Sequence, residues 1–508
     1  MPRDTPISSK TNGAGLTRRS LMRNAGGLLA LSALPIPLAW PLRAAFARPT
    51  DDSGESISPV MARLSTYMSE AADRPLPDEV ADQIKQHILD TVAAMISGSD
   101  LPPGRQAIKF ARAYGGEKIA TVAASDVLCG PIEAALANGL LAHSDETDDS
   151  HAPSQCHPGC AIVPAALAAG ERFGIGGAHF LRAVTLGYDV GPRVTMTLGA
   201  IDFMAETHRS TYSIAGTFGA AAAAACAARL DVRRMRWVLD YASQQSSGIA
   251  VWQRDTEHME KGFAFAGMPA RNGVTAALLV QSGLTGVDDV LSGADNFFLA
   301  NNPKADPAGL IDKLGERYEV TRTNIKKWTV GSPIQAVLDA IENLQKKNSF
   351  GADQVQKVVV RVATNEAKIV NNRELPDICL QHMTAVMLLD KTVTFRSAHD
   401  KPRMQDPAVL ALRAKVDLIP DEELERRLPV REAVVEITLK DGTTLTEHVV
   451  NVRGTAENPM PREEVATKAR DLMTPVLGAR QCADLIEKIL GLESVQDIRE
   501  LRPLLQRA

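Results

Sequence analysis

The sequence predicts a mainly α protein, with a large all-helical domain at 55–318, a smaller α+β lid domain at 319–461 and C-terminal helices at 462–508 that return to the helical domain. Three observations lead to this prediction. Apolar residues recur at helical spacing through the first segment, strand patterns appear in the second, and helical spacing resumes after Pro461. A hydrophobic content of 45% and a charged content of 23% are ordinary for a soluble globular chain.

The helical pattern of the first domain is clear in single stretches. Val80, Ile84 and Ile88 fall on one face of a helix predicted to run from Asp78 to Gly98, its candidate cap and stop. Several of the other stretches are rich in alanine and glycine, so their backbones can approach closely and they become stable by packing on one another. These further helices are predicted at 131–142, 161–173, 179–191, 217–230, 234–247 and 269–283.

The lid domain is predicted from two strand patterns and a hairpin turn. Valines dominate 355–362, and apolar and polar residues alternate through 433–439 as in a half-buried strand. Asp441-Gly442 then predicts a tight turn into a strand at 443–452. Helices and strands are mixed in this domain, because helical stretches are also predicted near 380–390 and 407–416.

The N-terminus has the features of an export signal. Arg18 and Arg19 form a twin-arginine pair, an apolar stretch follows at 26–42, and Ala45-Phe46-Ala47 is a small-x-small cleavage site. The apolar stretch is shorter than the ~20 residues that a membrane-spanning helix needs, and prolines interrupt it. We therefore predict cleavage after Ala47, a periplasmic mature protein, and the twin-arginine export machinery as a partner during transport.

Composition and motifs argue against several classes of function. A net charge of −5 provides no overall basic field for nucleic acid. No glycine-rich loop follows a predicted strand, so nucleotide binding is not expected. The six cysteines show no Cys-x-x-Cys pair and no zinc or iron–sulfur spacing. Their even number permits disulfides in an oxidising compartment without requiring them.

The densest polar segment lies between two apolar helices and is the strongest site candidate. Residues 143–157 contain three histidines and four acids, more titratable groups than a solvated loop needs. A loop that only caps the flanking helices is one alternative. A metal site is another, because imidazole and carboxylate are suitable ligands. The spacing of His143, His151 and His157 does not match a zinc-binding helix of the His-Glu-x-x-His type, and the residues alone leave these interpretations open.

The order of motifs in this region follows a known family. Ala137-Asn138-Gly139 is followed by His143-Ser144-Asp145-Glu146-Thr147-Asp148-Asp149-Ser150-His151 and then by His157-Pro158-Gly159. This order resembles the signature of the MmgE/PrpD family, which includes 2-methylcitrate dehydratase and cis-aconitate decarboxylase. Further landmarks extend the resemblance over nearly the whole mature chain: Gly187-Tyr188-Asp189-Val190, Ala215-Gly216-Thr217-Phe218-Gly219-Ala220, Met259-Glu260-Lys261, 267–273, Ile325-Lys326-Lys327-Trp328 and Gln381-His382-Met383.

The resemblance implies a set of site residues, three of which depart from the family pattern. Glu146 stands where an aspartate is usual, Ser150 where a threonine is usual, and His382 where a tyrosine is usual. The resemblance implies no metal ligand and no cofactor. The implied catalytic residues are His157, Lys261, Glu146, Ser150 and His382, and the implied substrate-binding residues are Lys326, His208, Asp149 and Arg271.

The resemblance also implies a 2-methylcitrate dehydratase-like fold, a homodimer, and a lyase acting on a small di- or tricarboxylate by dehydration, hydration or decarboxylation. Chemistry at a carbon next to a carboxylate needs an acid–base group, for which His157 is suited, and cations for the carboxylates, for which Lys261 and Lys326 are suited. An isomerase or epimerase of a dicarboxylate is a close variant. A metal-dependent hydrolase built on the His/Asp cluster and a binding protein that has lost catalysis are the alternatives.

Overall fold

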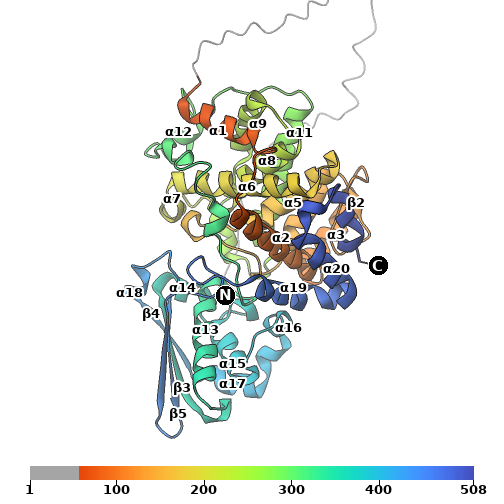
Figure 1. Ribbon diagram of the computed structural model, residues 1–508. Helices are drawn as coiled ribbons and strands as arrows, with labels where there is room; N and C mark the ends of the chain where they lie inside the picture. Colours follow the sequence, from red (N-terminus) through yellow and green to blue (C-terminus); the bar gives the residue numbers. More distant parts are fainter. Residues whose placement is uncertain (1–56, 508) are drawn as a thin grey trace, which may run out of the picture. The chain divides into compact units, whose positions relative to one another are not determined.

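The computed structural model of the protein describes residues 57–507 (Figure 1). The predicted twin-arginine signal at 1–47 and its cleavage site lie outside the described residues. Helices dominate the described range, which confirms the predicted mainly α class. Buried side chains form two cores, one drawn from 61–325 together with 460–505 and the other from 328–452. None of the helices within 57–507 combines the length and the apolar composition that crossing a bilayer requires.

The first core is built mainly from helices, with a two-stranded ribbon, β1 (Ala120–Thr121) and β2 (Leu128–Cys129), beside them. Helix α8 contacts α5, α6, α9 and α11. The helices of this part are α1 (Pro59–Glu70), α2 (Asp78–Gly98), α3 (Pro102–Tyr114), α4 (Pro131–Ala142), α5 (Pro158–Phe173), α6 (Gly177–Leu198), α7 (Ala200–Thr207), α8 (Thr211–Ala227), α9 (Val232–Gln245), α10 (Met259–Gly262), α11 (Met268–Gln281) and α12 (Phe297–Asn301).

Helix α8 can pack against so many neighbours because its side chains are small. A Cβ added at Gly219 would lie 2.7 Å from the Ile162 side chain and 2.9 Å from the carbonyl oxygen of Gly187, so glycine permits the close approach to α5 and α6. The helix begins earlier than the sequence predicted. Ser210 caps it by accepting a hydrogen bond from the backbone N–H of Ser213.

The second core packs helices on a four-stranded sheet with the strand order β4-β3-β5-β6. Strand β3 pairs parallel with β4 and antiparallel with β5, and β5 pairs antiparallel with β6 across the predicted turn. Helix α13 contacts β5 and β6 (Figure 1). The elements are α13 (Ser332–Lys347), β3 (Val355–Ala363), α14 (Thr364–Val370), α15 (Leu380–Asp390), α16 (Phe395–Ala398), α17 (Pro407–Arg413), β4 (Val416–Asp421), α18 (Glu422–Glu425), β5 (Ala433–Leu439) and β6 (Thr444–Val449).

Five elements of this second core were missed from the sequence: strand β4, helix α13 and the short helices α14, α16 and α18. Strand β4 lies at the edge of the sheet and contains Pro420. Proline is tolerated in strands mainly at sheet edges, so a proline in this segment argued against a strand when the sequence was considered alone. Helix α13 begins at Ser332-Pro333 and carries a regular apolar face. The predicted cap at Asp78 was also wrong: Asp78 is the first helical residue of α2, and Pro77 precedes it without a side-chain cap.

The C-terminal helices α19 (Arg462–Leu477), α20 (Ala479–Leu490) and α21 (Arg502–Leu505) contribute to the first core. Helix α19 contacts α2, and the Lys468 Nζ atom donates to the Asp90 carboxylate at 2.6 Å and to the Thr147 carbonyl oxygen at 2.9 Å. The tail thus supports the polar segment between α4 and α5. All six cysteines fall within the described residues, and all are buried and free.

Candidate active site

The polar segment 143–157 connects α4 to α5 and is enclosed by the protein. Every residue from His143 to Asp149 is buried, which is unusual for a segment with this many charges. His143 caps the C-terminus of α4, and His157 precedes α5 with Pro158 at the first helical position. Proline favours an extended conformation in the residue before it, which His157 has. The Ser150 backbone exchanges two hydrogen bonds with Asn324, of 3.0 and 2.8 Å, and so fixes the loop beside Lys326.

Asp148 organises two imidazoles. Its Oδ1 atom lies 3.0 Å from the Nδ1 atoms of both His143 and His157. Burial opposes its ionisation, but the two imidazoles hold the pKa of Asp148 well below its usual range. A carboxylate at Nδ1 favours the tautomer with the proton on Nδ1, which leaves Nε2 as the basic nitrogen of each ring. Burial lowers the pKa of His157 to about 4, so its imidazole is neutral near pH 7.

The Glu146 carboxylate lies next to two ammonium groups and one imidazole. Lys261 Nζ donates to its Oε1 atom, Lys326 Nζ lies 3.9 Å from its Oε2 atom, and the Nδ1 atom of His258 lies 3.9 Å from Oε1. Burial opposes ionisation here too, but Lys261 and the neighbouring cations hold the pKa of Glu146 well below its usual range. The lysine and the acid therefore form a buried ion pair.

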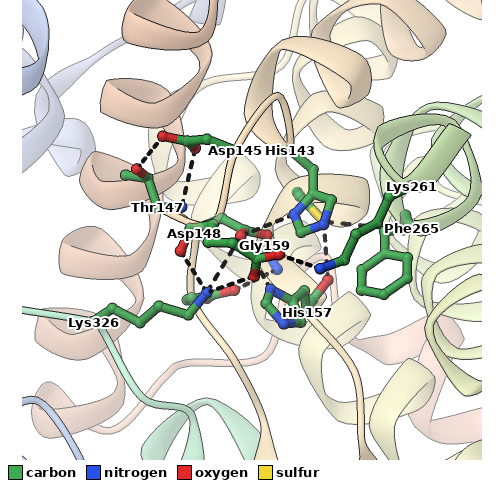
Figure 2. Close-up of polar contacts among 12 residues, drawn as sticks. His143, Asp145, Thr147, Asp148, His157, Gly159, Lys261, Phe265 and Lys326 are labelled. Atoms are coloured by element: carbon green, nitrogen blue, oxygen red, sulfur yellow. Dashed lines mark hydrogen bonds and ion pairs between the residues drawn. The ribbon is translucent and has the colours of Figure 1, made fainter. Parts of the chain in front are cut away.

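The two lysines bind the acidic loop from opposite sides, with His157 beside them (Figure 2). Lys326 Nζ donates to the Glu146 carbonyl oxygen at 2.6 Å and lies 3.8 Å from Asp148 Oδ1. Two carboxylates thus face two ammonium groups, and burial lowers the pKa of His258 to about 3. With His157 and His258 neutral, the two ammonium groups balance the two carboxylates.

We call the group formed by His143, Glu146, Asp148, His157, Lys261 and Lys326 the reactive cluster. An aromatic wall covers one side of it. The Phe265 ring stacks on His143 with centroids 4.7 Å apart and on Tyr212 at 3.8 Å. The Tyr212 ring lies 5.5 Å from the His157 ring, and Lys261 Nζ lies 5.2 Å from the Phe265 centroid. Phe265 belongs to a π-helical turn, η3 (Phe263–Gly267), between α10 and α11, and such turns recur at functional sites. The wall brings His157 and Lys261 into one environment.

Several polar atoms of the cluster have no protein partner. Within residues 57–507, His143 Nε2, His258 Nε2, Asp148 Oδ2 and Trp252 Nε1 are buried without a hydrogen bond. A buried polar atom without a partner costs free energy unless a ligand or water satisfies it. The atoms of His143, Asp148 and His157, and those of His143, Glu146 and His258, are also close enough together to hold a metal ion.

Two predicted site residues support the loop. The oxygens of Asp149 accept from Tyr188 Oη at 2.6 Å and from the Gly159 N–H at 2.9 Å, and Oδ2 lies 2.8 Å from His87 Nδ1. Asp149 is fully buried, so it anchors the N-terminus of α5 and has no oxygen left for a substrate. Ser150 is half-buried and lines a pocket together with Lys326.

Three other predicted residues are not brought into contact with the cluster. His208 is exposed after α7, and the Arg271 guanidinium contacts the Asn272 side chain and the Phe263 ring. His382 is fully buried in α15, and neither of its ring nitrogens has a partner within the described range. Burial lowers the pKa of His382 to about 4, so it is a neutral imidazole inside the second core.

The sequence missed His258 and the aromatic wall. His258 precedes Lys261 by three residues, a spacing that brings two side chains to one side of a helical turn and could have indicated it. The partners of Tyr212 and Trp252 lie far away in the sequence, so no local pattern indicates them.

A second ion pair links the polar loop to the segment after α16. His399 Nε2 lies 3.0 Å from Asp145 Oδ2, and its Nδ1 atom lies 2.7 Å from the Phe395 carbonyl oxygen. Burial opposes protonation, but Asp145 raises the pKa of His399 to about 9. The imidazolium form is therefore the one that stabilises the fold.

Replacing His399 with glutamine should destabilise the protein in a pH-dependent way. A folded-state pKa above the unfolded value adds stability that is complete below about pH 6.5 and disappears as the pH rises through 9. The pKa of Asp145 is lowered, so the stabilisation also fades as the pH falls through the acidic range. We expect a loss of up to ~3 kcal/mol in the free energy of unfolding near pH 6 and almost none above pH 9.5, measured by urea denaturation.

His448 provides the matched control for this measurement. Its Nε2 atom pairs with Glu432 at 2.7 Å, but the His448 side chain is 40% exposed, and exposed pairs contribute little. His448→Gln should change stability by less than about 0.5 kcal/mol at any pH. An equal loss in the His399 variant at pH 6 and pH 9.5 would contradict the assigned ion pair.

Comparison with known proteins identifies the family. The MmgE/PrpD N-terminal domain matches residues 62–308, and the MmgE/PrpD C-terminal domain matches residues 328–492. The cis-aconitate decarboxylase-like protein oryM of Aspergillus oryzae is 24% identical over 476 residues, covering 88% of this chain and 97% of that protein. Cis-aconitate decarboxylase of Aspergillus terreus is 25% identical, covering 88% and 96%, and the human cis-aconitate decarboxylase is 26% identical, covering 85% and 91%. Because the two domain models match in order over most of its length, the chain belongs to the MmgE/PrpD family.

Proposed function

We propose that the protein is a cofactor-independent lyase acting on a small di- or tricarboxylate at a carbon next to a carboxylate, as a dehydratase, hydratase or decarboxylase. One observation carries the proposal: a neutral His157, held at Nδ1 by Asp148, lies in one cluster with the ammonium groups of Lys261 and Lys326. The names of the relatives, cis-aconitate decarboxylases, support carboxylate chemistry of this kind.

The geometry suits proton transfer beside a carboxylate. In a dehydration, His157 Nε2 takes the proton from the carbon, the electron pair moves toward the carboxylate, and the hydroxyl leaves as water when a proton is returned. In a decarboxylation, neutral His157 first takes up a proton from solvent at Nε2. The carbon–carbon bond then breaks, carbon dioxide leaves, and the imidazolium gives that proton to the carbon. In both reactions Lys261, which is 20% exposed, can stabilise the negative charge that develops on the carboxylate. Asp148 stabilises the imidazolium formed in the first case.

A screen of the mature protein against di- and tricarboxylates tests the proposal. We expect mass spectrometry to detect the loss or gain of water, or the loss of carbon dioxide, with at least one substrate, and Lys261→Ala to abolish the change. Running the screen in deuterium oxide identifies the isomerase or epimerase variant, because that reaction incorporates deuterium without a net change of composition. Turnover of none of the panel by a folded wild-type protein would contradict the lyase proposal.

A metal-dependent hydrolase is the second candidate, because two groups of described residues could hold an ion: His143 with Asp148 and His157, and His143 with Glu146 and His258. The charge balance disfavours it, since two ammonium groups already compensate the two carboxylates, and a divalent ion would add two positive charges. Elemental analysis distinguishes the candidates. A stoichiometric metal whose removal abolishes activity, and whose return restores it, would favour the hydrolase.

We also propose that the protein is exported by the twin-arginine route and acts in the periplasm as a homodimer. We expect the mature protein recovered from the periplasm of a bacterial host to begin at Arg48, as measured by intact mass and N-terminal sequencing. Replacing Arg18 and Arg19 with lysines should retain the full-length chain in the cytoplasm. Processing of that variant at the same position would contradict the twin-arginine assignment. Sedimentation of the mature protein tests the dimer.

A further inference from the structure

A pocket of about 190 Å³ adjoins the reactive cluster. Ser150 and Lys326 line it, and the backbone of Ser150 pairs with that of Asn324, two residues before Lys326. The rest of its lining comes from five segments of the chain, at 152–153, 322–325, 332–335, 429–431 and 450–457. The pocket therefore lies where a substrate would extend beyond the lysines.

Two arginines of this pocket are held in the same way. Arg322 Nη1 donates to Glu319 Oε2 at 2.8 Å, and Arg431 Nη1 donates to Glu366 Oε1 at 2.5 Å. Both carboxylates are buried, so each guanidinium is anchored at one end by a fixed partner. Within residues 57–507, the Nε and Nη2 atoms of both arginines have no hydrogen-bond partner.

The third arginine of the lining differs from these two. Arg453 donates through Nε and Nη2 to Glu464 and through Nη1 to Asn458, so all three nitrogens are engaged. The contrast shows that free guanidinium donors are a particular property of Arg322 and Arg431 in this pocket. A planar guanidinium with two free nitrogens matches the geometry of a carboxylate.

Arg431 also acts electrostatically on the wall of the reactive cluster. Burial raises the pKa of Tyr212 to about 12, and the Arg431 guanidinium is the largest influence opposing that rise. The Tyr212 ring in turn lies 5.5 Å from the His157 ring. Geometry places the pocket beside the acid–base group: Lys326 lines the pocket, and its Nζ atom lies 3.8 Å from Asp148 Oδ1, the atom that is 3.0 Å from His157 Nδ1.

We propose that Arg322 and Arg431 bind a second carboxylate of the substrate, the one remote from the carbon where the reaction occurs. The lysines hold the first carboxylate beside His157, and the arginines hold the second in the adjoining pocket. This inference rests on the proposed function and extends it, because it assigns the recognition of the second carboxylate to Arg322 and Arg431.

Binding of tricarballylate, a saturated tricarboxylate without the hydroxyl or double bond needed for reaction, tests the proposal by isothermal titration calorimetry. We expect Arg431→Gln to weaken binding about 10–100-fold, as for the loss of a charge-assisted contact. Glu366→Gln removes only the anchor and should leave binding within about threefold of wild type, because the arginine donors remain. Butyrate, a monocarboxylate, should bind weakly to all variants, and inorganic phosphate reports any affinity for anions in general.

The second arginine has its own matched control. Arg317 also donates to Glu319, through Nε at 2.8 Å, but it does not line the pocket. We expect Arg322→Gln to weaken tricarballylate binding and Arg317→Gln to leave it unchanged. Should Arg431→Gln fail to fold because Glu366 is left unpaired, the double variant Glu366→Gln/Arg431→Gln removes both charges and should show the same weakened binding.

The outcomes separate this inference from the proposed function. Equal weakening by Arg431→Gln and Glu366→Gln, or no weakening by Arg431→Gln, would overturn the carboxylate pocket, even if wild-type enzyme turns over a polycarboxylate. Tight tricarballylate binding that depends on Arg431, in a protein that converts none of the panel, would overturn the lyase proposal and support the pocket. Phosphate binding as tight as tricarballylate would overturn the assignment to a carboxylate.

Discussion

Replacing His157 with asparagine should lower kcat by about 10²–10⁴-fold on the substrate found in the screen, the usual contribution of a general acid–base group. The asparagine amide can still donate to Asp148 from near the position of Nδ1, but it provides no basic nitrogen in place of Nε2. The loss should therefore fall on kcat, with a small effect on tricarballylate binding. For a dehydration, in which neutral His157 is the base, kcat/KM of the wild type should fall as the pH drops toward about 4, where His157 becomes protonated. For a decarboxylation, in which the imidazolium is the acid, kcat/KM should rise over the same range.

His179 is the matched control for this variant. It is a buried histidine of the same core, and its Nε2 atom lies 2.9 Å from the Cys226 carbonyl oxygen, away from the cluster. His179→Asn should reduce stability without reducing kcat by more than a few-fold. Wild-type turnover in a folded His157→Asn protein would rule out His157 as the acid–base group and would direct attention to His143 or His258, whose Nε2 atoms are also without a protein partner in the described chain.

Replacing Lys261 with methionine should lower kcat by about 10²–10³-fold, the cost of removing one donor to a developing negative charge. The same change leaves Glu146 as an unpaired buried carboxylate, which by itself can destabilise the site. The double variant Lys261→Met/Glu146→Gln removes both charges. We expect it to recover most of the lost stability in thermal unfolding and to remain inactive, because stability depends on the pair and catalysis depends on the ammonium group.

Lys327 is the control for Lys261. Its Nζ atom pairs with Glu342 at 2.6 Å, and this partly buried ion pair lies outside the cluster. Lys327→Met should leave kcat within about threefold of wild type. Activity in the Lys261/Glu146 double variant close to that of wild type would show that the lysine only compensates a buried charge.

The helices could be predicted because their patterns are local. An apolar side chain every three or four residues marks a buried face whatever it packs against, and so the bounds of α2 and α4 agree with the structure. Strand β5 was predicted for the same reason, because its apolar residues alternate with polar ones in the sequence and its buried side chains alternate with exposed ones in the structure. Strand β4 was not predicted because its buried and exposed residues do not alternate regularly. Its partner β3 is separated from it in the sequence by helices α14 to α17, so no local pattern indicates the pairing.

The residues of the candidate site also divide into those that a local pattern indicates and those that only the structure brings together. The segment 143–157 was identified because its charges lie next to one another in the sequence, and Lys261 and Lys326 were found only through motifs resembling a family. His208 and Arg271, chosen in the same manner, do not contact the cluster in the structure. Phe265 and Tyr212 were missed, since their proximity to His157 depends on how α8 and the π-helical turn pack. His258 was missed because its contacts with His143 and Glu146 join distant parts of the sequence.

The sequence by itself determined the helical class, the strands with regular alternation and the acidic, histidine-rich segment, because each depends on residues within one or two turns of chain. Only the tertiary structure decided which nitrogen of each imidazole is free, which carboxylate each lysine neutralises, and that Arg322 and Arg431 share a pocket. These properties depend on distances between side chains, from nine positions apart for His157 and Asp148 to more than a hundred for Lys261 and Glu146. A hydrogen bond needs its heavy atoms at about 3 Å, and composition and spacing do not supply distances of that precision.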